Sequence, residues 1–176
     1  MTFEVFTNNV MSYSVVHVEI DYTAKLIRRT YSLTLPCVSG EINKYKITQA
    51  ELNEAYDRDL HYSLKFRDSG FVSKIVDYDI ERKSLIQEYT EPSLLLTGRR
   101  PSVPEVLELF KFYKAHGINK INNALSNLTY ANKQLISFDF KYTRQRPEAN
   151  DREFASYDNW MVKIDPSLPA LLKEMH

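Results

Sequence analysis

The sequence holds a single cysteine, Cys37, and only four glycines among its 176 residues. One cysteine cannot form a disulfide within the chain, so nothing favours an oxidising compartment and we expect a cytoplasmic protein. No apolar run approaches the roughly 18 to 20 residues of a membrane-spanning helix. The N-terminal segment MTFEVFTNNV also lacks the basic and apolar regions of a signal peptide. Secretion and membrane insertion are therefore not expected.

Motifs that define a particular chemistry are also missing. The sequence contains no G-x-G-x-x-G, Walker A or G-x-S-x-G motif, and no histidine or cysteine group has the spacing of a zinc site. We therefore expect no cofactor and no structural metal, and the sequence specifies no reaction.

The composition is nevertheless that of a folded protein. Hydrophobic residues make up 43% of the chain and aromatic residues 12%, without repeats or low-complexity tracts. A chain of this length can bury one substantial core, so we expect one domain over residues 1–176.

The first part of the chain predicts a β-hairpin. Residues 13–20 (YSVVHVEI) and 25–35 (KLIRRTYSLTL) are rich in β-branched and aromatic residues, and DYTA between them can turn. In the second segment Ile27 and Tyr31 share one side of the alternation with Arg29, while the other side is mostly polar. This pattern is typical of an antiparallel sheet with one solvated face.

A helix and several further strands should follow. Thr48 and Glu51 have the spacing of a capping box, which predicts a short helix over 49–56. Residues 60–66 alternate strictly between apolar and polar side chains, which predicts a strand before the turn signal Asp68-Ser69-Gly70. Other strands are expected at 71–78, 85–89 and 93–96.

After Pro101 the apolar spacing becomes helical. Ser102 and Glu105 form a second capping box and predict a helix over 103–113 that stops at Gly117. A second helix is expected over 118–128, followed by strands at 136–142 and 160–164 and a helix after Pro166.

This order of elements predicts an α+β fold, with a mainly antiparallel sheet packed by two central helices and a short C-terminal helix. Residues 1–98 would supply most strands and one short helix, 99–131 the helix pair, and 132–176 the last strands and the terminal helix.

The charges are segregated although the net charge is zero. Residues 99–146 contain nine basic residues and three acidic ones, interleaved with aromatics, and the rest of the chain carries more acids than bases. Several cations on one surface can bind phosphates, and exposed aromatics can stack on bases. We therefore expect a surface that binds DNA or RNA. Its candidate residues are Arg99, Arg100, Lys111, Lys114, Asn119, Lys120, Lys141, Arg144 and Arg146.

The predicted helices on either side of Gly117 have the order of a helix-turn-helix. In that motif the second helix shows base-reading side chains near its N-terminus, where this chain has Asn119 and Lys120, and then Asn122 and Asn123. Helix pairs joined at a glycine occur in many folds, however. The lysines could equally solvate the outer faces of core helices.

Two alternatives stay open. A protein-binding module of the inhibitor or immunity type, without catalytic activity, could use the same charge segregation to meet a charged partner. Alternatively, Glu81-Arg82-Lys83 resembles the acid-x-lysine element of PD-(D/E)xK nucleases, and that resemblance implies an Mg²⁺ site with Asp68 as the upstream acid. The leading proline of that element is missing. A second acid-x-lysine triplet, residues 139–141, lacks an acid close upstream.

Overall fold

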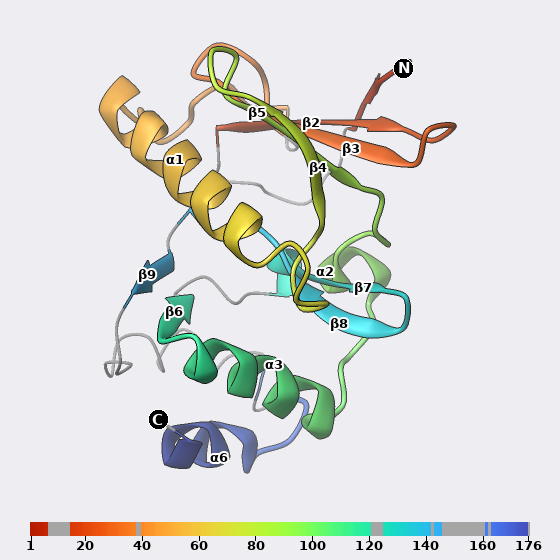
Figure 1. Ribbon diagram of the computed structural model, residues 1–176, viewed down its shortest axis with the longest axis vertical. Coiled ribbons are helices and arrows are strands. Elements are labelled where there is room, and N and C mark those ends of the chain that lie inside the picture. The colour runs from red at the N-terminus through yellow and green to blue at the C-terminus, as the bar shows by residue number, and fades with distance from the viewer. Residues whose placement is uncertain are drawn as a thin grey trace. The chain divides into compact units, whose positions relative to one another are not determined.

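The chain forms two compact units in the computed structural model (Figure 1). Unit 1 comprises Met1–Arg67 and Lys74–Tyr89, and unit 2 comprises Asp68–Ser73 and Thr90–His176. The α+β class predicted from the sequence is confirmed. The structure describes residues 1–6, 15–37, 40–120, 125–141, 143–145, 161 and 163–175.

Unit 1 contains a five-stranded antiparallel sheet in the order β1-β2-β3-β5-β4. The predicted hairpin is confirmed as β2 and β3, whose register runs from Val16 opposite Tyr31 to Asp21 opposite Leu26. A β-bulge interrupts the pairing of β4 with β5 between Ile75 and Asp77. The strands are β1 (Glu4–Val5), β2 (Val16–Asp21), β3 (Leu26–Tyr31), β4 (Ile75–Asp79) and β5 (Ser84–Glu88).

The helix α1 (Gln49–Lys65) packs on one face of this sheet (Figure 1). The capping box starts it as predicted: the Glu51 amide donates to Thr48 Oγ1 over 3.3 Å, and the Thr48 amide donates to Glu51 Oε2 over 2.8 Å. Leu52 and Tyr56 from α1 join Leu85 from β5 in the core of the unit. Burying side chains of this size contributes about 1.5–3 kcal/mol each.

The strand predicted over 60–66 is wrong, because α1 continues to Lys65. The alternation also fits a helix: Leu60 and Leu64 are four residues apart, as are Tyr62 and Phe66, and such pairs share a helix face. Residues 49–67 contain neither proline nor glycine. The sequence between the capping box and Lys65 therefore contains no signal that would end the helix at residue 56.

Two other strand predictions in this region need correction, and one holds. The expected strand 71–78 is shorter and later, as β4, and β5 confirms the strand expected at 85–89. Residues expected as a strand at 93–96 form the one-turn helix α2 (Leu94–Thr97), which ends at Gly98 in a left-handed conformation with φ 67°. That glycine supplies a helix stop that alternation alone does not reveal.

Unit 2 combines helices with two short antiparallel ribbons. β6 pairs with β9 and β7 pairs with β8, and the helix α3 packs against β8 and α6 (Figure 1). Its core includes Leu109, Phe110 and Tyr113 from α3 and Phe140. The elements are α2, α3 (Val103–Ala115), β6 (Ile118–Lys120), the 3-10 turn η1 (Leu125–Asn127), β7 (Leu128–Ala131), β8 (Gln134–Ser137), β9 (Thr143–Gln145) and α6 (Leu168–Met175).

The predicted helix pair is half right. The helix over 103–113 is confirmed as α3, with both halves of the Ser102 and Glu105 capping box formed. The second helix over 118–128 is wrong: Ile118–Lys120 is a strand paired with Thr143–Gln145, and the part described after it is η1 and then β7. Gly117 has φ 59°, so the chain turns there and does not restart a helix.

The remaining predictions concern the end of the chain. The strand expected over 136–142 ends at Ser137 as β8, because Asp139 has φ 63°, which a strand does not tolerate. Met161, Lys163 and Ile164 form no strand, and the other residues of that expected strand lie outside those described. The helix after Pro166 is confirmed as α6. Among the described residues, no helix is both long and apolar enough to cross a membrane.

Candidate functional site

A buried ion pair lies at the centre of unit 1. Arg29 Nη1 on β3 lies 2.7 Å from Asp59 Oδ2 on α1, and the two side chains are 6% and 0% exposed. The same carboxylate accepts from the Tyr31 hydroxyl at 2.6 Å and the Ser63 hydroxyl at 3.2 Å. The sequence held one signal for this site, since Arg29 falls on the apolar side of its strand. It gave no way to find Asp59, because the region around it reads as two separate elements.

A second, largely buried ion pair follows β8 in unit 2. Lys141 Nζ contacts Asp139 Oδ2, with side chains 8% and 13% exposed. Nearby, Lys120 is buried and its ammonium lies 5.4 Å from the centre of the Phe140 ring. Lys120 and Lys141 were both expected to contact phosphates at the surface. The structure places both inside unit 2.

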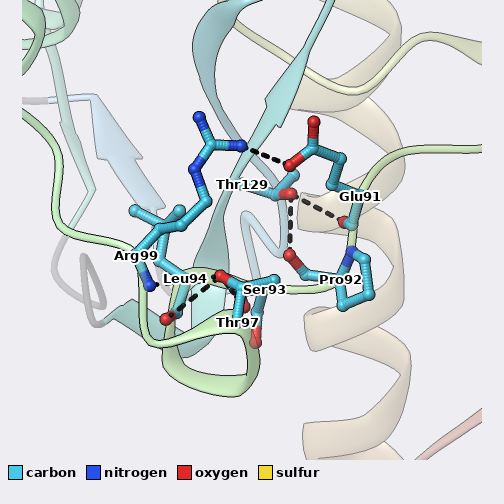
Figure 2. Close-up of polar contacts among 7 residues, drawn as sticks. All are labelled: Glu91, Pro92, Ser93, Leu94, Thr97, Arg99 and Thr129. Atoms are coloured by element: carbon cyan, nitrogen blue, oxygen red, sulfur yellow. Dashed lines mark hydrogen bonds and ion pairs between the residues drawn. The ribbon is translucent and has the colours of Figure 1, made fainter.

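Figure 2 shows the polar contacts around Arg99 in unit 2. Arg99 Nη1 lies 2.5 Å from Glu91 Oε2, and both side chains are about half exposed. Thr129 Oγ1 lies 2.6 Å and 3.1 Å from the carbonyl oxygens of Glu91 and Pro92, so β7 holds the segment that carries Glu91. Thr97 Oγ1 in turn bonds the Ser93 carbonyl within the α2 turn, at 3.3 Å.

An aromatic ring and a second acid complete this group. The Arg99 guanidinium carbon lies 3.9 Å from the centre of the Tyr130 ring. Burial raises the pKa of Tyr130 to about 12, and the carboxylate of Glu105 beside its hydroxyl adds to the shift. We call Glu91, Arg99, Glu105 and Tyr130 the Arg99 cluster. Two acids flank its one cation, so the cluster is not positively charged.

The other predicted phosphate-binding residues are dispersed over unit 2. Lys111 pairs with Glu108 at 2.6 Å, and Asn119 is buried in β6. Arg100 and Lys114 are exposed, and the described residues include no ion pair with either of them. Arg144 lies on β9, with a side chain that is outside the description, and Arg146 lies outside the described residues altogether. A helix-turn-helix does not form, since Asn119 and Lys120 are on a strand.

The candidate nuclease residues fall in different units. Asp68 belongs to unit 2, whereas Glu81 and Lys83 belong to unit 1. Glu81 and Lys83 lie in the turn between β4 and β5, where Lys83 has φ 50°. In the described part of the chain no group of three or more His, Cys, Asp or Glu residues could hold a metal.

Comparison with known proteins identifies the fold. No family model and no curated protein matches the sequence. The crystal structure of the Rio2 kinase from Chaetomium thermophilum is similar, with a TM-score of 0.61 and 10% identity over 93% of this chain. The chain spans 60% of the length of that kinase chain. At this identity the likeness is one of fold alone.

Proposed function

We propose that this chain is a protein-binding module built on a kinase-like fold, and that it does not transfer phosphate. The likeness to the Rio2 kinase supports the fold. Differences between this chain and the catalytic motifs of kinases support the second half of the proposal.

The first of these parts is the glycine-rich loop. Protein kinases cover the phosphates of ATP with a G-x-G-x-x-G loop at the start of the sheet, where glycines let the backbone approach the ligand. The segment between β1 and β2 in this chain, FTNNVMSYSV, contains no glycine. The catalytic-loop sequence H-R-D, whose aspartate is the catalytic base, does not occur anywhere in this sequence.

The Arg29 and Asp59 pair is the observation that carries the proposal. An active kinase pairs a β3 lysine with a glutamate of the following helix, and that lysine also reaches the nucleotide phosphates. Here the β3 cation is an arginine that is 6% exposed, and its partner Asp59 also accepts from Tyr31 and Ser63. A cation held this way supports the packing of α1 on the sheet and has little freedom to reach a phosphate.

One sequence in this chain resembles the magnesium-binding D-F-G element of kinases in its first two residues. Kinases bind Mg²⁺ through the aspartate of D-F-G and an asparagine of the catalytic loop. This chain has Asp139-Phe140-Lys141 after β8, and the Lys141 ammonium contacts the Asp139 carboxylate. The ammonium supplies a positive charge at the carboxylate, where a kinase would have the metal. The residues present therefore do not fit an Mg²⁺ ion.

Two measurements test this proposal together. In a transfer assay with radiolabelled ATP and Mg²⁺ or Mn²⁺, we expect no phosphate on the chain itself or on a generic protein substrate. In affinity capture from the native source, we expect one stoichiometric protein and no nucleic acid. Metal-dependent transfer that disappears in Asp139→Asn would overturn the proposal, as would capture that recovers no protein.

Nucleic-acid binding through residues 99–146 stays our second proposal. Arg100 and Lys114 are exposed, and the segment has nine basic residues against three acids. It predicts affinity for DNA or RNA that weakens steeply with added salt and weakens further in Arg100→Ala/Lys114→Ala. Lack of binding to either polymer at low salt removes it. A cytoplasmic location is likewise a proposal, supported by the lone Cys37.

A further inference from the structure

β4 is an outer strand of the sheet in unit 1. It pairs with β5 and, within the described part of the chain, with no second strand. The Tyr31 amide donates to the Lys83 carbonyl, and the Tyr89 amide donates to the Lys25 carbonyl. The backbone groups of the odd-numbered residues of β5 therefore face β3. The backbone groups of the even-numbered residues of β5 consequently face β4, where Ile86 lies opposite Asp77 and Ser84 lies opposite Asp79.

The backbone groups of Tyr78 consequently face away from the sheet. Its amide donates to the carboxylate of the neighbouring Asp77 over 2.8 Å, a bond that a second strand would otherwise provide. The bulge at Val76 lies just before this point. Bulges and charged side chains are common ways to protect an edge, yet the edge can still accept an incoming strand.

Apolar and acidic side chains alternate along β4 and into the turn that follows it. Val76, Tyr78 and Ile80 are 47%, 44% and 61% exposed, three large apolar side chains within five residues. Asp77 and Glu81 between and beyond them are exposed acids. Exposed apolar side chains grouped on a sheet edge are typical of a binding surface.

The charges decide which partner fits. A second copy could pair antiparallel with the same edge in a register centred on residue 77, 78 or 79. These registers place Asp77 opposite Asp77, Asp77 opposite Asp79, and Asp79 opposite Asp79 of the other copy. Like charges directly opposite one another destabilise a strand pair. An added strand that alternates basic with apolar residues would instead meet each acid with a cation and each apolar side chain with another.

We propose that the β4 edge binds an extended peptide segment of alternating basic and apolar residues, as an added strand. The inference rests on the proposed protein-binding function and deepens it by naming the surface and the chemistry of the partner. Backbone hydrogen bonds beside Tyr78 supply affinity, and the alternating side chains supply specificity.

The probe is a fluorescent nine-residue peptide of alternating lysine and valine, with blocked ends. We expect its anisotropy to rise on titration with the full chain. The same peptide with every second backbone nitrogen methylated should bind at least tenfold more weakly, because methylation removes the strand hydrogen bonds. Asp77→Lys should weaken binding of the lysine peptide about five- to tenfold and favour the glutamate–valine counterpart.

Asp57→Lys is the matched control, because Asp57 is also an exposed aspartate of unit 1 but lies on α1. It changes the net charge equally and should leave both peptides unaffected. Equal weakening by Asp57→Lys and Asp77→Lys would mean general electrostatic attraction and would overturn the proposal. Binding that methylation leaves unchanged would overturn it too.

Affinity capture with the Asp77→Lys chain separates this proposal from the one on which it rests. If the wild-type chain captures a protein and Asp77→Lys captures it equally well, the β4 surface is wrong and the binding module stands. If the wild-type chain captures none, the proposed function itself fails.

Discussion

Three side chains of unit 1, those of Arg29, Tyr31 and Ser63, contact the buried carboxylate of Asp59. Replacing it with alanine leaves the Arg29 guanidinium buried without its carboxylate and removes the acceptor of Tyr31 and Ser63. Removing one partner of a buried pair typically costs about 3–5 kcal/mol. We expect Asp59→Ala to lower the free energy of unfolding by about that much, as measured by urea denaturation followed by circular dichroism.

The double variant Arg29→Met/Asp59→Leu tests the reason. It removes both charges and keeps similar volumes, so it should be more stable than Asp59→Ala. If the double variant is as unstable as Asp59→Ala, altered packing and not the unpaired Arg29 charge accounts for the lower free energy of unfolding.

Two tyrosines should make stability depend on alkaline pH. Burial raises the pKa of Tyr56 and of Tyr130 from 10.0 to about 12, so the folded chain holds these protons more tightly than the unfolded chain. Their contribution is fully present below pH 10 and is lost as the pH rises toward 12. We expect urea midpoints to fall over this range and to fall less in Tyr130→Phe. An equal fall in Tyr130→Phe would contradict the assignment for that residue.

Residue-level prediction from the sequence was limited by burial. Composition located the excess of cations in 99–146, but Lys120 is 1% exposed and Lys141 is 7% exposed. Whether a lysine faces water depends on the element that carries it. For Lys120 the predicted element was a helix, and the observed element is the strand β6. A strand at Ile118–Lys120 points Lys120 into unit 2, where a surface helix would have left it in solvent.

At the scale of elements, the capping boxes were the most reliable signals. Both predicted helix starts, at Thr48 and Ser102, are correct, because a cap depends only on residues within one turn. The end of α1 was missed, because residues 60–66 alternate as a strand would. The strand β6 was missed because its pairing with β9 joins residues far apart in the sequence. The predicted α+β class is still correct, because strands were expected at the positions of β2, β3 and β5.

The caps give a direct prediction. Thr48→Ala removes the hydroxyl that accepts from the Glu51 amide, and loss of such a cap typically costs about 1 kcal/mol. We expect a corresponding fall in the free energy of unfolding, while Thr48→Ser, which keeps the hydroxyl, should stay close to wild type. If Thr48→Ala and Thr48→Ser are equally stable, the capping box contributes nothing measurable to α1.

At the scale of the whole molecule, pairing with acids limits what the segregated charge can do. Glu91 holds Arg99 and Glu108 holds Lys111, so two exposed cations of the basic segment are already neutralised. Each additional phosphate that a protein neutralises steepens the dependence of log K on log salt by roughly 0.7 to 0.9. The two glutamates therefore act against polyanion binding.

Replacing both glutamates should leave Arg99 and Lys111 available to bind phosphates. We expect Glu91→Gln/Glu108→Gln to bind single-stranded DNA more tightly than the wild-type chain, with a salt slope steeper by about 1.4, measured by anisotropy at several salt concentrations. Glu54→Gln, which breaks the Glu54 and Arg58 pair on α1, is the control and should change neither quantity comparably. A double variant that binds no better than wild type would show that the freed cations of unit 2 do not converge on a phosphate backbone, and the nucleic-acid proposal would then lose its remaining support.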